Sequence, residues 1–264
     1  MLKIEGAVAV ITGGASGIGE SIAKYWVKQG GRVVLGDISS DELSRVEKEI
    51  TSSGGEVVTC VCDVTTEADN ALLARCAIEH FGAINLVVPC AGIIRDSLLL
   101  SPDRETGRVE GRMSLEQFQS VLDCNLTGVF LTIRECAEEM INHRCKGLIC
   151  LMSSIGALGT AGQINYSSTK AAMSVLPKVI SAEFFRRDLA HSIRCVAVAP
   201  GYVDTPMVRG MDQKALDKII KDVPIQRLVD PEEIASLMCE LFRNEAINGE
   251  VYFIHGGLRL GSRG

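Results

Sequence analysis

The chain has 264 residues, of which 47% are hydrophobic and 23% charged, and its formal net charge is −6. This composition is typical of a compact globular protein and excludes a disordered or fibrous one. The negative charge argues against a nucleic-acid backbone as a partner. No apolar run reaches the ~18 residues of a membrane span, and the N-terminus lacks the apolar core of a signal peptide. We therefore expect neither a nucleic acid nor a membrane as partner.

The ten cysteines are scattered along the chain. The closest pair, Cys60 and Cys62, alternates along an expected strand and does not have the spacing of a zinc knuckle. We therefore expect no metal site, and we interpret the cysteines as reduced thiols of a cytoplasmic protein.

Short apolar, β-branched runs alternate with amphipathic segments in chain order. The runs expected to be strands are residues 7–11, 32–35, 57–62, 84–88, 148–152, 193–199 and 251–254. The segments expected to be helices are residues 19–29, 41–51, 67–80, 115–143, 166–187 and 231–243. Continuous apolar strands separated by helices predict an α/β fold, a doubly wound parallel sheet of the Rossmann type with helices on both faces. No linker interrupts the alternation, so residues 1–264 are expected to form a single domain.

Three segments depart from this alternation. Residues 101–112 are polar, with two glycines and alternating charge, and predict an exposed loop or a small hairpin. Pro177 falls inside an expected helix, where it removes a backbone donor, so we expect a kink there. Residues 207–224 have the polar, charged character of a mobile lid that would set substrate specificity.

A glycine-rich turn joins the first expected strand to the first expected helix. Its sequence is Thr12-Gly13-Gly14-Ala15-Ser16-Gly17-Ile18-Gly19. Glycines let the backbone turn sharply and approach a ligand closely, and the free amides at the helix N-terminus then face a pyrophosphate. The alternative is a tight turn that packs the helix on the sheet without a ligand.

Asp37 ends the second expected strand, eighteen residues after Gly19. An acidic side chain at this place accepts hydrogen bonds from the adenosine ribose hydroxyls and repels a 2′-phosphate. No Lys or Arg stands at positions 14–16 or 38–40, so the sequence favours NAD over NADP. The alternative, that Asp37 caps the following helix, is weaker because Ser39 and Ser40 are better placed for that role.

Tyr166 and Lys170 stand four residues apart at the start of an expected helix, so they share one helix face. A lysine ammonium beside a phenol favours the phenolate, which makes a tyrosine able to exchange protons at neutral pH. Taken alone, such a pair is more often a solvated surface pair. Whether this pair takes part in proton transfer must therefore be judged from the other motifs of the chain.

Over nearly its whole length the chain resembles the compact short-chain dehydrogenase/reductases. The motifs that carry the resemblance are the glycine turn, Cys62-Asp63-Val64, Pro89-Cys90-Ala91-Gly92, Asn125, the Ser153 to Tyr166 interval, and Pro200-Gly201-Tyr202-Val203-Asp204-Thr205. The family usually has asparagine where Cys90 stands, a change that activity should survive. Residues 95–99 are similar to the β-ketoacyl carrier-protein reductases, a branch that typically uses NADPH. The insert at residues 101–112 is longer than in that branch; it could touch a neighbouring subunit or an acyl carrier, or be inert.

The resemblance implies catalytic roles for four residues. Tyr166 would transfer the proton of a secondary alcohol, and Lys170 would support it and bind the nicotinamide ribose. Asn125 would hold a water linked to Lys170. Ser153, thirteen residues before Tyr166, would donate to the substrate oxygen, a role that the adjacent Ser154 could take instead. The cofactor-binding residues implied are Thr12, Gly13, Ser16, Gly17, Ile18, Gly19, Asp37, Ile38, Asp63, Val64, Cys90, Ala91, Gly92, Tyr166, Lys170, Pro200, Gly201, Val203 and Thr205.

The sequence therefore indicates an NAD-dependent oxidoreductase that interconverts a secondary alcohol and a ketone, with a 3-hydroxyacyl/3-oxoacyl thioester as the expected substrate. Three alternatives stay open: another secondary alcohol (a steroid, sugar or cyclic alcohol), an epimerase or dehydratase, and a catalytically silent cofactor-binding module. The resemblance also implies a homo-oligomer, a tetramer built through the helices at 115–143 and 166–187 and the C-terminal strand. Exposed apolar side chains such as Phe184, Phe185 and Phe253 would fit such an interface.

Overall fold

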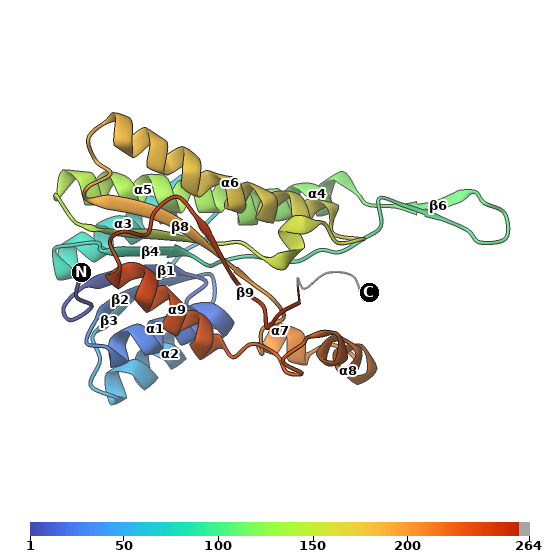
Figure 1. The fold of residues 1–264 in the computed structure, drawn as a ribbon, viewed down its shortest axis with the longest axis horizontal. Helices are drawn as coiled ribbons and strands as arrows, with labels where there is room; N and C mark the ends of the chain where they lie inside the picture. Colours follow the sequence, from blue (N-terminus) through green and yellow to red (C-terminus); the bar gives the residue numbers. More distant parts are fainter. Residues whose placement is uncertain (259–264) are drawn as a thin grey trace.

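Seven parallel strands form the centre of the molecule, in the order β3-β2-β1-β4-β7-β8-β9 (Figure 1). The computed structural model describes residues 1–258, without the side chains of residues 207 and 215. The strands are β1 Val8–Thr12, β2 Arg32–Asp37, β3 Val57–Val61, β4 Leu86–Pro89, β7 Gly147–Met152, β8 Ile193–Pro200 and β9 Val251–Ile254. Each run that the sequence assigned to a strand lies in this sheet. The expected doubly wound fold is confirmed.

Helices cover both faces of the sheet (Figure 1). One face carries α1 Gly17–Lys28, α2 Ser40–Ser52 and α9 Pro231–Arg243, and the other carries α3 Glu67–Phe81, α5 Gly128–Asn142 and α6 Ile164–Arg186. Strand β1 shows how the sequence builds the two layers. Ala9 and Ile11 pack in the first layer, whereas Val8 and Val10 pack in the second, because alternate side chains of a strand point to opposite faces.

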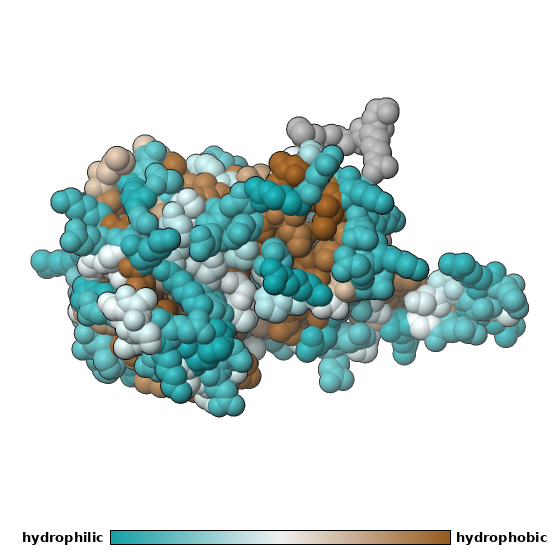
Figure 2. All heavy atoms as spheres, turned by 90° about the horizontal axis from the view of Figure 1, so that it is seen from below, coloured by the Kyte–Doolittle hydropathy of each residue, from teal (hydrophilic) through white to brown (hydrophobic). Residues whose placement is uncertain are grey.

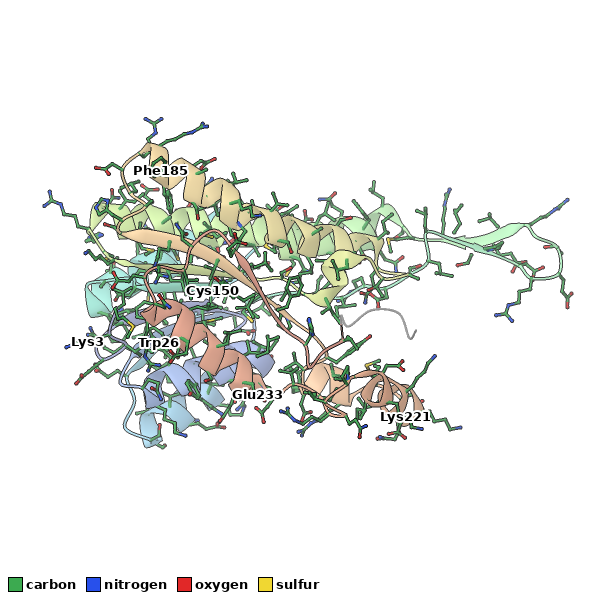
Figure 3. All side chains as sticks on the ribbon, in the orientation of Figure 1. Lys3, Trp26, Cys150, Phe185, Lys221 and Glu233 are labelled. Carbon is green, nitrogen blue, oxygen red and sulfur yellow. The ribbon has the colours of Figure 1, made fainter. Side chains whose placement is uncertain are left out.

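Trp26 of α1 anchors the first layer. Its ring packs edge-on against Phe242 of α9, with 4.9 Å between the ring centroids, and its Nε1 donates to the Ala7 carbonyl oxygen at 3.1 Å. The tryptophan is thus buried without an unpaired donor. Figure 3 shows Trp26 and Cys150 within the layers, whereas Lys3, Lys221 and Glu233 extend outward.

The segment expected to be helical over residues 115–143 is helical without a break, and the structure adds a feature within it. Helix α4, Leu115–Leu122, passes into a π-helical segment, Asp123–Thr127, and then into α5. A π-turn accommodates one extra residue and is frequent at functional sites. Helix α6 runs without interruption from Ile164 to Arg186 with Pro177 buried inside it, and the kink at Pro177 stays a prediction.

The segment 101–112, expected as a loop or small hairpin, forms an antiparallel hairpin of β5 Leu100–Pro102 and β6 Val109–Arg112. It projects away from the body of the molecule (Figure 1). The expected lid carries two helices, α7 Pro206–Arg209 and α8 Gln213–Asp222. Within residues 1–258 no helix has the length and apolar character to cross a bilayer.

The strand order fixes where a ligand can bind. The chain proceeds from β1 outward to β2 and β3, then returns to place β4 on the other side of β1. Loops that follow adjacent strands therefore diverge at the carboxyl ends of β1 and β4, and such a switch point is where open α/β sheets bind ligands.

Candidate active site

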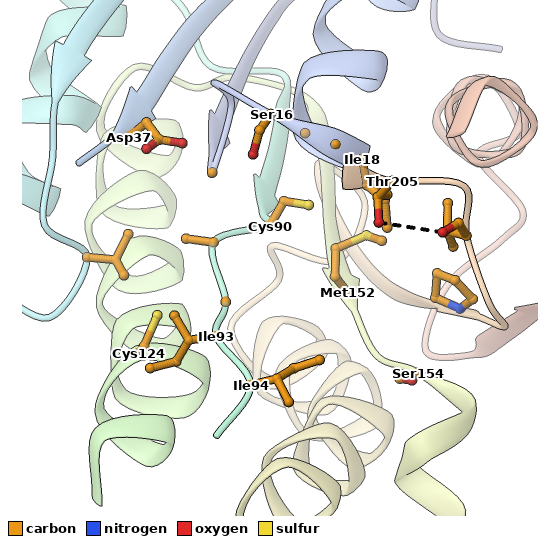
Figure 4. A pocket seen from close by; sticks show the side chains of 18 of the residues that line it. Ser16, Ile18, Asp37, Cys90, Ile93, Ile94, Cys124, Met152, Ser154 and Thr205 are labelled. Carbon is orange, nitrogen blue, oxygen red and sulfur yellow. Dashed lines mark hydrogen bonds between the residues drawn. The ribbon is translucent and has the colours of Figure 1, made fainter. Parts of the chain in front are cut away.

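A cleft of about 470 Å³ opens at the carboxyl ends of the central strands (Figure 4). Figure 4 shows Asp37 and Ser16 toward one end of the cleft and Ile94 and Ser154 toward the other. The lining residues include most of those predicted from the sequence: Gly13, Ser16, Gly17, Ile18, Gly19, Asp37, Ile38, Asp63, Val64, Cys90, Ala91, Gly92, Ser153, Tyr166, Lys170, Pro200, Gly201, Val203 and Thr205. The fold thus gathers these distant segments around one space.

The glycine turn packs too tightly for side chains at two positions. A Cβ on Gly13, whose φ is +63°, would lie 2.8 Å from both the Cα and the nitrogen of Ala91. A Cβ on Gly19 would lie 2.1 Å from the Gly13 carbonyl oxygen. Both obstacles are backbone atoms, so they cannot move aside as a flexible side chain would. These glycines let the turn fold against the loop after β4 and leave the start of α1 open to a ligand.

Replacing Gly19 with Ala is expected to open this turn and to weaken dinucleotide binding by at least about tenfold, which corresponds to about 1.4 kcal/mol. The measurement is the Kd of the reduced cofactor from its fluorescence. Gly111→Ala is the matched control for a glycine substitution away from the cleft, because Gly111 lies outside the left-handed region and its Cβ would meet only the Ser101 side chain, at 3.4 Å. Equal Kd values for the Gly19 variant and the unaltered protein would contradict the role of this turn.

Two carboxylates lie near the nucleotide end. Asp37 accepts from the Ala15 nitrogen at 3.2 Å through Oδ2 and from the Ser39 nitrogen at 3.1 Å through Oδ1. These bonds hold the carboxylate beside the glycine turn. Ser39 caps α2, accepting from the Glu42 nitrogen, so the cap belongs to Ser39 and not to Asp37, as the sequence indicated. Asp63 accepts from the nitrogen and the hydroxyl of Thr65, which fixes the loop after β3.

Cys90 stands directly after β4, where the Ala91 nitrogen donates to Thr12 Oγ1 at 3.3 Å. Thr12 is 1% exposed and does not line the cleft. Its hydroxyl instead connects the end of β1 to the loop after β4. Burial raises the pKa of the Cys90 thiol to about 11, although Lys170 opposes the shift. The thiol is therefore neutral at physiological pH and acts as a small apolar wall.

Lys170 and Tyr166 lie together at the start of α6. The Lys170 side chain is only 8% exposed, and its Nζ donates to the Met152 carbonyl oxygen at 2.8 Å. The same nitrogen lies 5.5 Å from the centroid of the Tyr166 ring. The alternative of a solvated surface pair does not fit this burial. The two residues form one element of the cleft wall.

The two serines after β7 point in different directions. Ser153, 4% exposed, donates from Oγ to the Lys170 carbonyl oxygen at 2.9 Å and lies 2.8 Å from Ser174 Oγ, so its hydroxyl is held by α6. Ser154 instead accepts from the Gly156 nitrogen at 3.0 Å. A Cβ on Gly156 would lie 3.2 Å from Cε1 of Tyr166 and 3.4 Å from Ser154 Oγ. Hence the hydroxyl that shares a space with the Tyr166 ring is that of Ser154.

Met152, Ser153 and Ser154 all line the cleft. Of the two serine hydroxyls, that of Ser153 is engaged by α6, whereas that of Ser154 accepts only from the Gly156 nitrogen. The role expected for Ser153 stays a prediction, and these contacts favour Ser154, the alternative, as the donor to a substrate.

Asn125 is 1% exposed and lies in the π-helical segment. Its Oδ1 accepts from the Ile93 nitrogen at 2.8 Å, and its Nδ2 donates to the Ile93 carbonyl oxygen at 2.9 Å. The side chain therefore ties the π-turn to the loop that follows β4. It is not among the residues that line the cleft.

Ser154, which the sequence left open as the alternative to Ser153, also lines the cleft. The lining residues that the sequence assigned no role are Cys62, Ile93, Ile94, Cys124, Met152 and Pro206. Most of these are apolar or weakly polar, and only Cys62 belongs to a motif. Among the described residues, no group of three or more His, Cys, Asp or Glu side chains could hold a metal ion.

Comparison with known proteins decides the family. The family model described as enoyl-(acyl carrier protein) reductase matches residues 13–259. The chain belongs to the short-chain dehydrogenase/reductase family. It is 33% identical to the 3-oxoacyl-[acyl-carrier-protein] reductase FabG of Thermotoga maritima, over 97% of this chain and 99% of that protein. It is 35% identical to the 3-hydroxyacyl-CoA dehydrogenase type-2 of Drosophila melanogaster, with the same two coverages.

A solved short-chain dehydrogenase/reductase of Serratia marcescens has the same fold, with a TM-score of 0.83 and 27% identity over 97% of this chain and 99% of that one. Membership makes this protein an NAD(P)-dependent oxidoreductase that acts on CH–OH or keto groups. The cleft fits a dinucleotide, because a tightly folded glycine turn lines it just before α1, and Asp37 stands at the end of β2.

Proposed function

We propose that this short-chain dehydrogenase/reductase interconverts 3-hydroxyacyl and 3-oxoacyl thioesters with NAD. The observation that carries the chemistry is that Tyr166, Lys170 and Ser154 line the same cleft as the glycine turn and Asp37. Ser154 and Asp37 lie toward opposite ends of it (Figure 4). The thioester assignment is supported by the names of the relatives, which act on 3-oxoacyl and 3-hydroxyacyl thioesters. The silent-module alternative is disfavoured because the proton-transfer residues are together.

Residues of this chain carry out the proton transfer and stabilise the developing charge, and a bound nicotinamide would supply the hydride chemistry. Tyr166 takes the proton of the alcohol in oxidation and returns it in reduction. The Lys170 ammonium, beside the ring, stabilises negative charge on the phenol oxygen as the proton moves. Ser154 donates to the substrate oxygen where charge develops. Asn125 fixes the position of the π-turn relative to the loop after β4 through its two hydrogen bonds to the Ile93 backbone.

The dinucleotide is held, in this proposal, by the residues implied by the family motifs that also line the cleft: Gly13, Ser16, Gly17, Ile18, Gly19, Asp37, Ile38, Asp63, Val64, Cys90, Ala91, Gly92, Lys170, Pro200, Gly201, Val203 and Thr205. The preference for NAD rests on Asp37, whose carboxylate is anchored where a 2′-phosphate would lie. Lys170 is the one Lys or Arg among the described lining residues, and it belongs to the proton-transfer group. No other Lys or Arg in that lining could pair with a 2′-phosphate.

Replacing Asp37 with Ala should raise the KM for NAD by about tenfold and bring the kcat/KM values for NAD and NADP closer together, since it removes both a ribose acceptor and a repulsive charge. The measurement is the ratio of kcat/KM for the two cofactors. Asp41→Ala, an exposed acid on α2, is the control for loss of one negative charge nearby. A protein that already prefers NADPH before substitution would contradict the assignment of NAD.

The apolar part of the cleft lining also favours an acyl chain over a sugar. Ile93, Ile94, Met152 and Pro206 belong to this lining. The test is NADH oxidation with acetoacetyl-CoA, simple ketones and keto-steroids compared in parallel. The proposal expects the highest kcat/KM with acetoacetyl-CoA. A higher value for a steroid or simple ketone would replace the substrate class, and no turnover with any of them would favour the silent module.

We also propose that the protein is a cytoplasmic homo-oligomer, a tetramer as in compact relatives. The ten cysteines are all free thiols, which suits a reducing compartment. Apolar side chains are exposed along the outer helices: Leu115, Phe130, Ile141, Ile164, Val175, Val179 and Phe185. Phe184, by contrast, packs against the core, and Phe253 is 38% exposed beside His255.

A further inference from the structure

The hairpin of β5 and β6 and the residues at its base, 98–113, form an arm that extends from the body of the molecule (Figure 1). A two-stranded hairpin is marginally stable by itself in water. This arm is nevertheless well built. Its strands pair Leu100 with Arg112 and Ser101 with Gly111, and at the tip Asp103 Oδ1 accepts from the nitrogens of Glu105 and Thr106. Because such a hairpin is only marginally stable alone, contact with another surface would stabilise the arm.

The base of the arm is apolar and uncovered. Leu98, Leu99 and Leu100 are all more than half exposed, at 52%, 61% and 51%, and Val109, opposite Pro102 toward the tip, is 54% exposed. Figure 2 shows the arm hydrophilic over its tip and hydrophobic where it joins the body. Three consecutive leucines exposed at one place on a monomer mark an interaction surface, in contrast to a single exposed leucine.

This apolar base continues onto the helices. The Ser97 nitrogen donates to the Gly162 carbonyl oxygen at 2.9 Å, and the Met113 nitrogen donates to the Leu99 carbonyl oxygen, which places the base against the start of α4 and of α6. The residues exposed there are Leu115 at 78%, Leu158 at 61% and Ile164 at 42%. The arm therefore extends the same apolar face for which a homo-oligomeric contact is proposed above.

The charges of the arm favour another copy of this chain as the partner. Its acidic residues are Asp103, Glu105 and Glu110, and its basic residues are Arg104, Arg108 and Arg112, so its formal charge is zero. An acidic carrier protein or a nucleic acid would be matched by an excess of positive charge. A neutral, alternating pattern is instead self-complementary and adds no repulsion between two chains that each carry −6.

We propose that the arm docks on a second copy of this chain, with its apolar base buried against that copy and its charged tip paired with the surface beyond. The two residues Arg95 and Asp96, just before the arm, also contact the first turn of α6, which carries Tyr166. Gln163 Nε2 donates to Asp96 Oδ2 at 2.8 Å, and the buried Asn165 donates to the Arg95 carbonyl oxygen at 2.9 Å, one residue before Tyr166. Docking of the arm thus stiffens the first turn of α6, which carries the proton-transfer residue.

The test is sedimentation equilibrium of the full chain over a range of concentrations. The double variant Leu99→Asp/Leu100→Asp is expected to raise the dissociation constant of the assembly by at least about 100-fold, tenfold or more for each buried contact replaced by a charge. Leu72→Asp is the matched control, since Leu72 is 51% exposed on α3, away from the arm. A second variant joins Ser101 to Gly111 through Asn-Gly, which keeps the paired ends and removes the tip.

Hydrogen exchange of the unaltered protein supplies a readout that no folding defect can mimic. On dilution below the dissociation constant, amides of the arm and of the first turn of α6 should lose protection together. A single-chain mass for the unaltered protein at all concentrations would overturn the proposal, and so would unchanged association of the double variant. Unchanged association with weakened binding of an acyl carrier protein would assign the arm to the carrier instead. None of these measurements uses catalysis, so their failure is separate from failure of the proposed activity.

Discussion

Replacing Tyr166 with Phe should lower kcat by about 10²- to 10⁴-fold, the range that a general acid or base contributes. The expected loss is specific to turnover. The ring that lies 5.5 Å from Lys170 Nζ is kept, and only the hydroxyl that carries the proton is removed. The Kd for NADH should therefore change by less than about threefold, because the dinucleotide is held mainly by the glycine turn and the loops after β2, β4 and β8.

The measurements are steady-state kcat with acetoacetyl-CoA and the Kd of NADH by fluorescence. Tyr25→Phe is the matched control, because Tyr25 lies on α1, packed against the core and outside the cleft. An unchanged kcat in the Tyr166 variant would remove the tyrosine from proton transfer. Loss of NADH binding would show instead that the hydroxyl has a structural role.

The second large effect is expected at Ser154. Ser154→Ala should lower kcat/KM by about 10²- to 10³-fold, as does removal of one donor to a developing oxyanion. Ser153→Ala should leave kcat/KM within about threefold and should instead cost about 1 kcal/mol of folding stability, the net contribution of a typical hydrogen bond. The reason is geometric: the Ser153 hydroxyl is bonded to α6, and Ser174 still donates to the Lys170 carbonyl oxygen at 3.3 Å when Ser153 is gone.

The comparison requires both variants in one assay series, with thermal unfolding measured alongside. The opposite result, a large kinetic loss in Ser153→Ala and a near-normal Ser154→Ala, would return the catalytic role to Ser153. Equal kinetic losses would mean that the two hydroxyls act through one network across α6.

Much of the fold follows from the sequence because its signals are local. Each β-branched run became a strand, and Asp37 and the glycine turn lie on the elements expected for them. The hairpin at 101–112 also belongs to this class, since its glycines and alternating charges indicate a turn between exposed segments. A local sequence pattern does not determine how an element is oriented relative to the rest of the fold. The projection of the arm away from the body is therefore seen only in the structure.

Two site features escaped the sequence for the same reason. Residues 115–143 have a helical pattern throughout, and the single extra residue of the π-turn at Asp123–Thr127 leaves no mark in that pattern. Counting residues back from Tyr166 named Ser153 as the donor and left Ser154 as the alternative, without a way to decide between them. The orientation of the serines, however, is set by the alternation of β7 and by the length of the loop that follows it.

Tyr166 and Ser154 are proposed to face a substrate oxygen at one end of an NAD cleft. A crystal structure of the Tyr166→Phe protein with NAD and 3-hydroxybutyryl-CoA tests this placement most directly, because the substrate is trapped without turnover. We expect the 3-hydroxyl oxygen within about 3.2 Å of Ser154 Oγ, next to the ring at position 166, and the adenosine ribose hydrogen-bonded to Asp37. A hydroxyl bonded to Ser153, or a thioester bound outside this cleft, would contradict it.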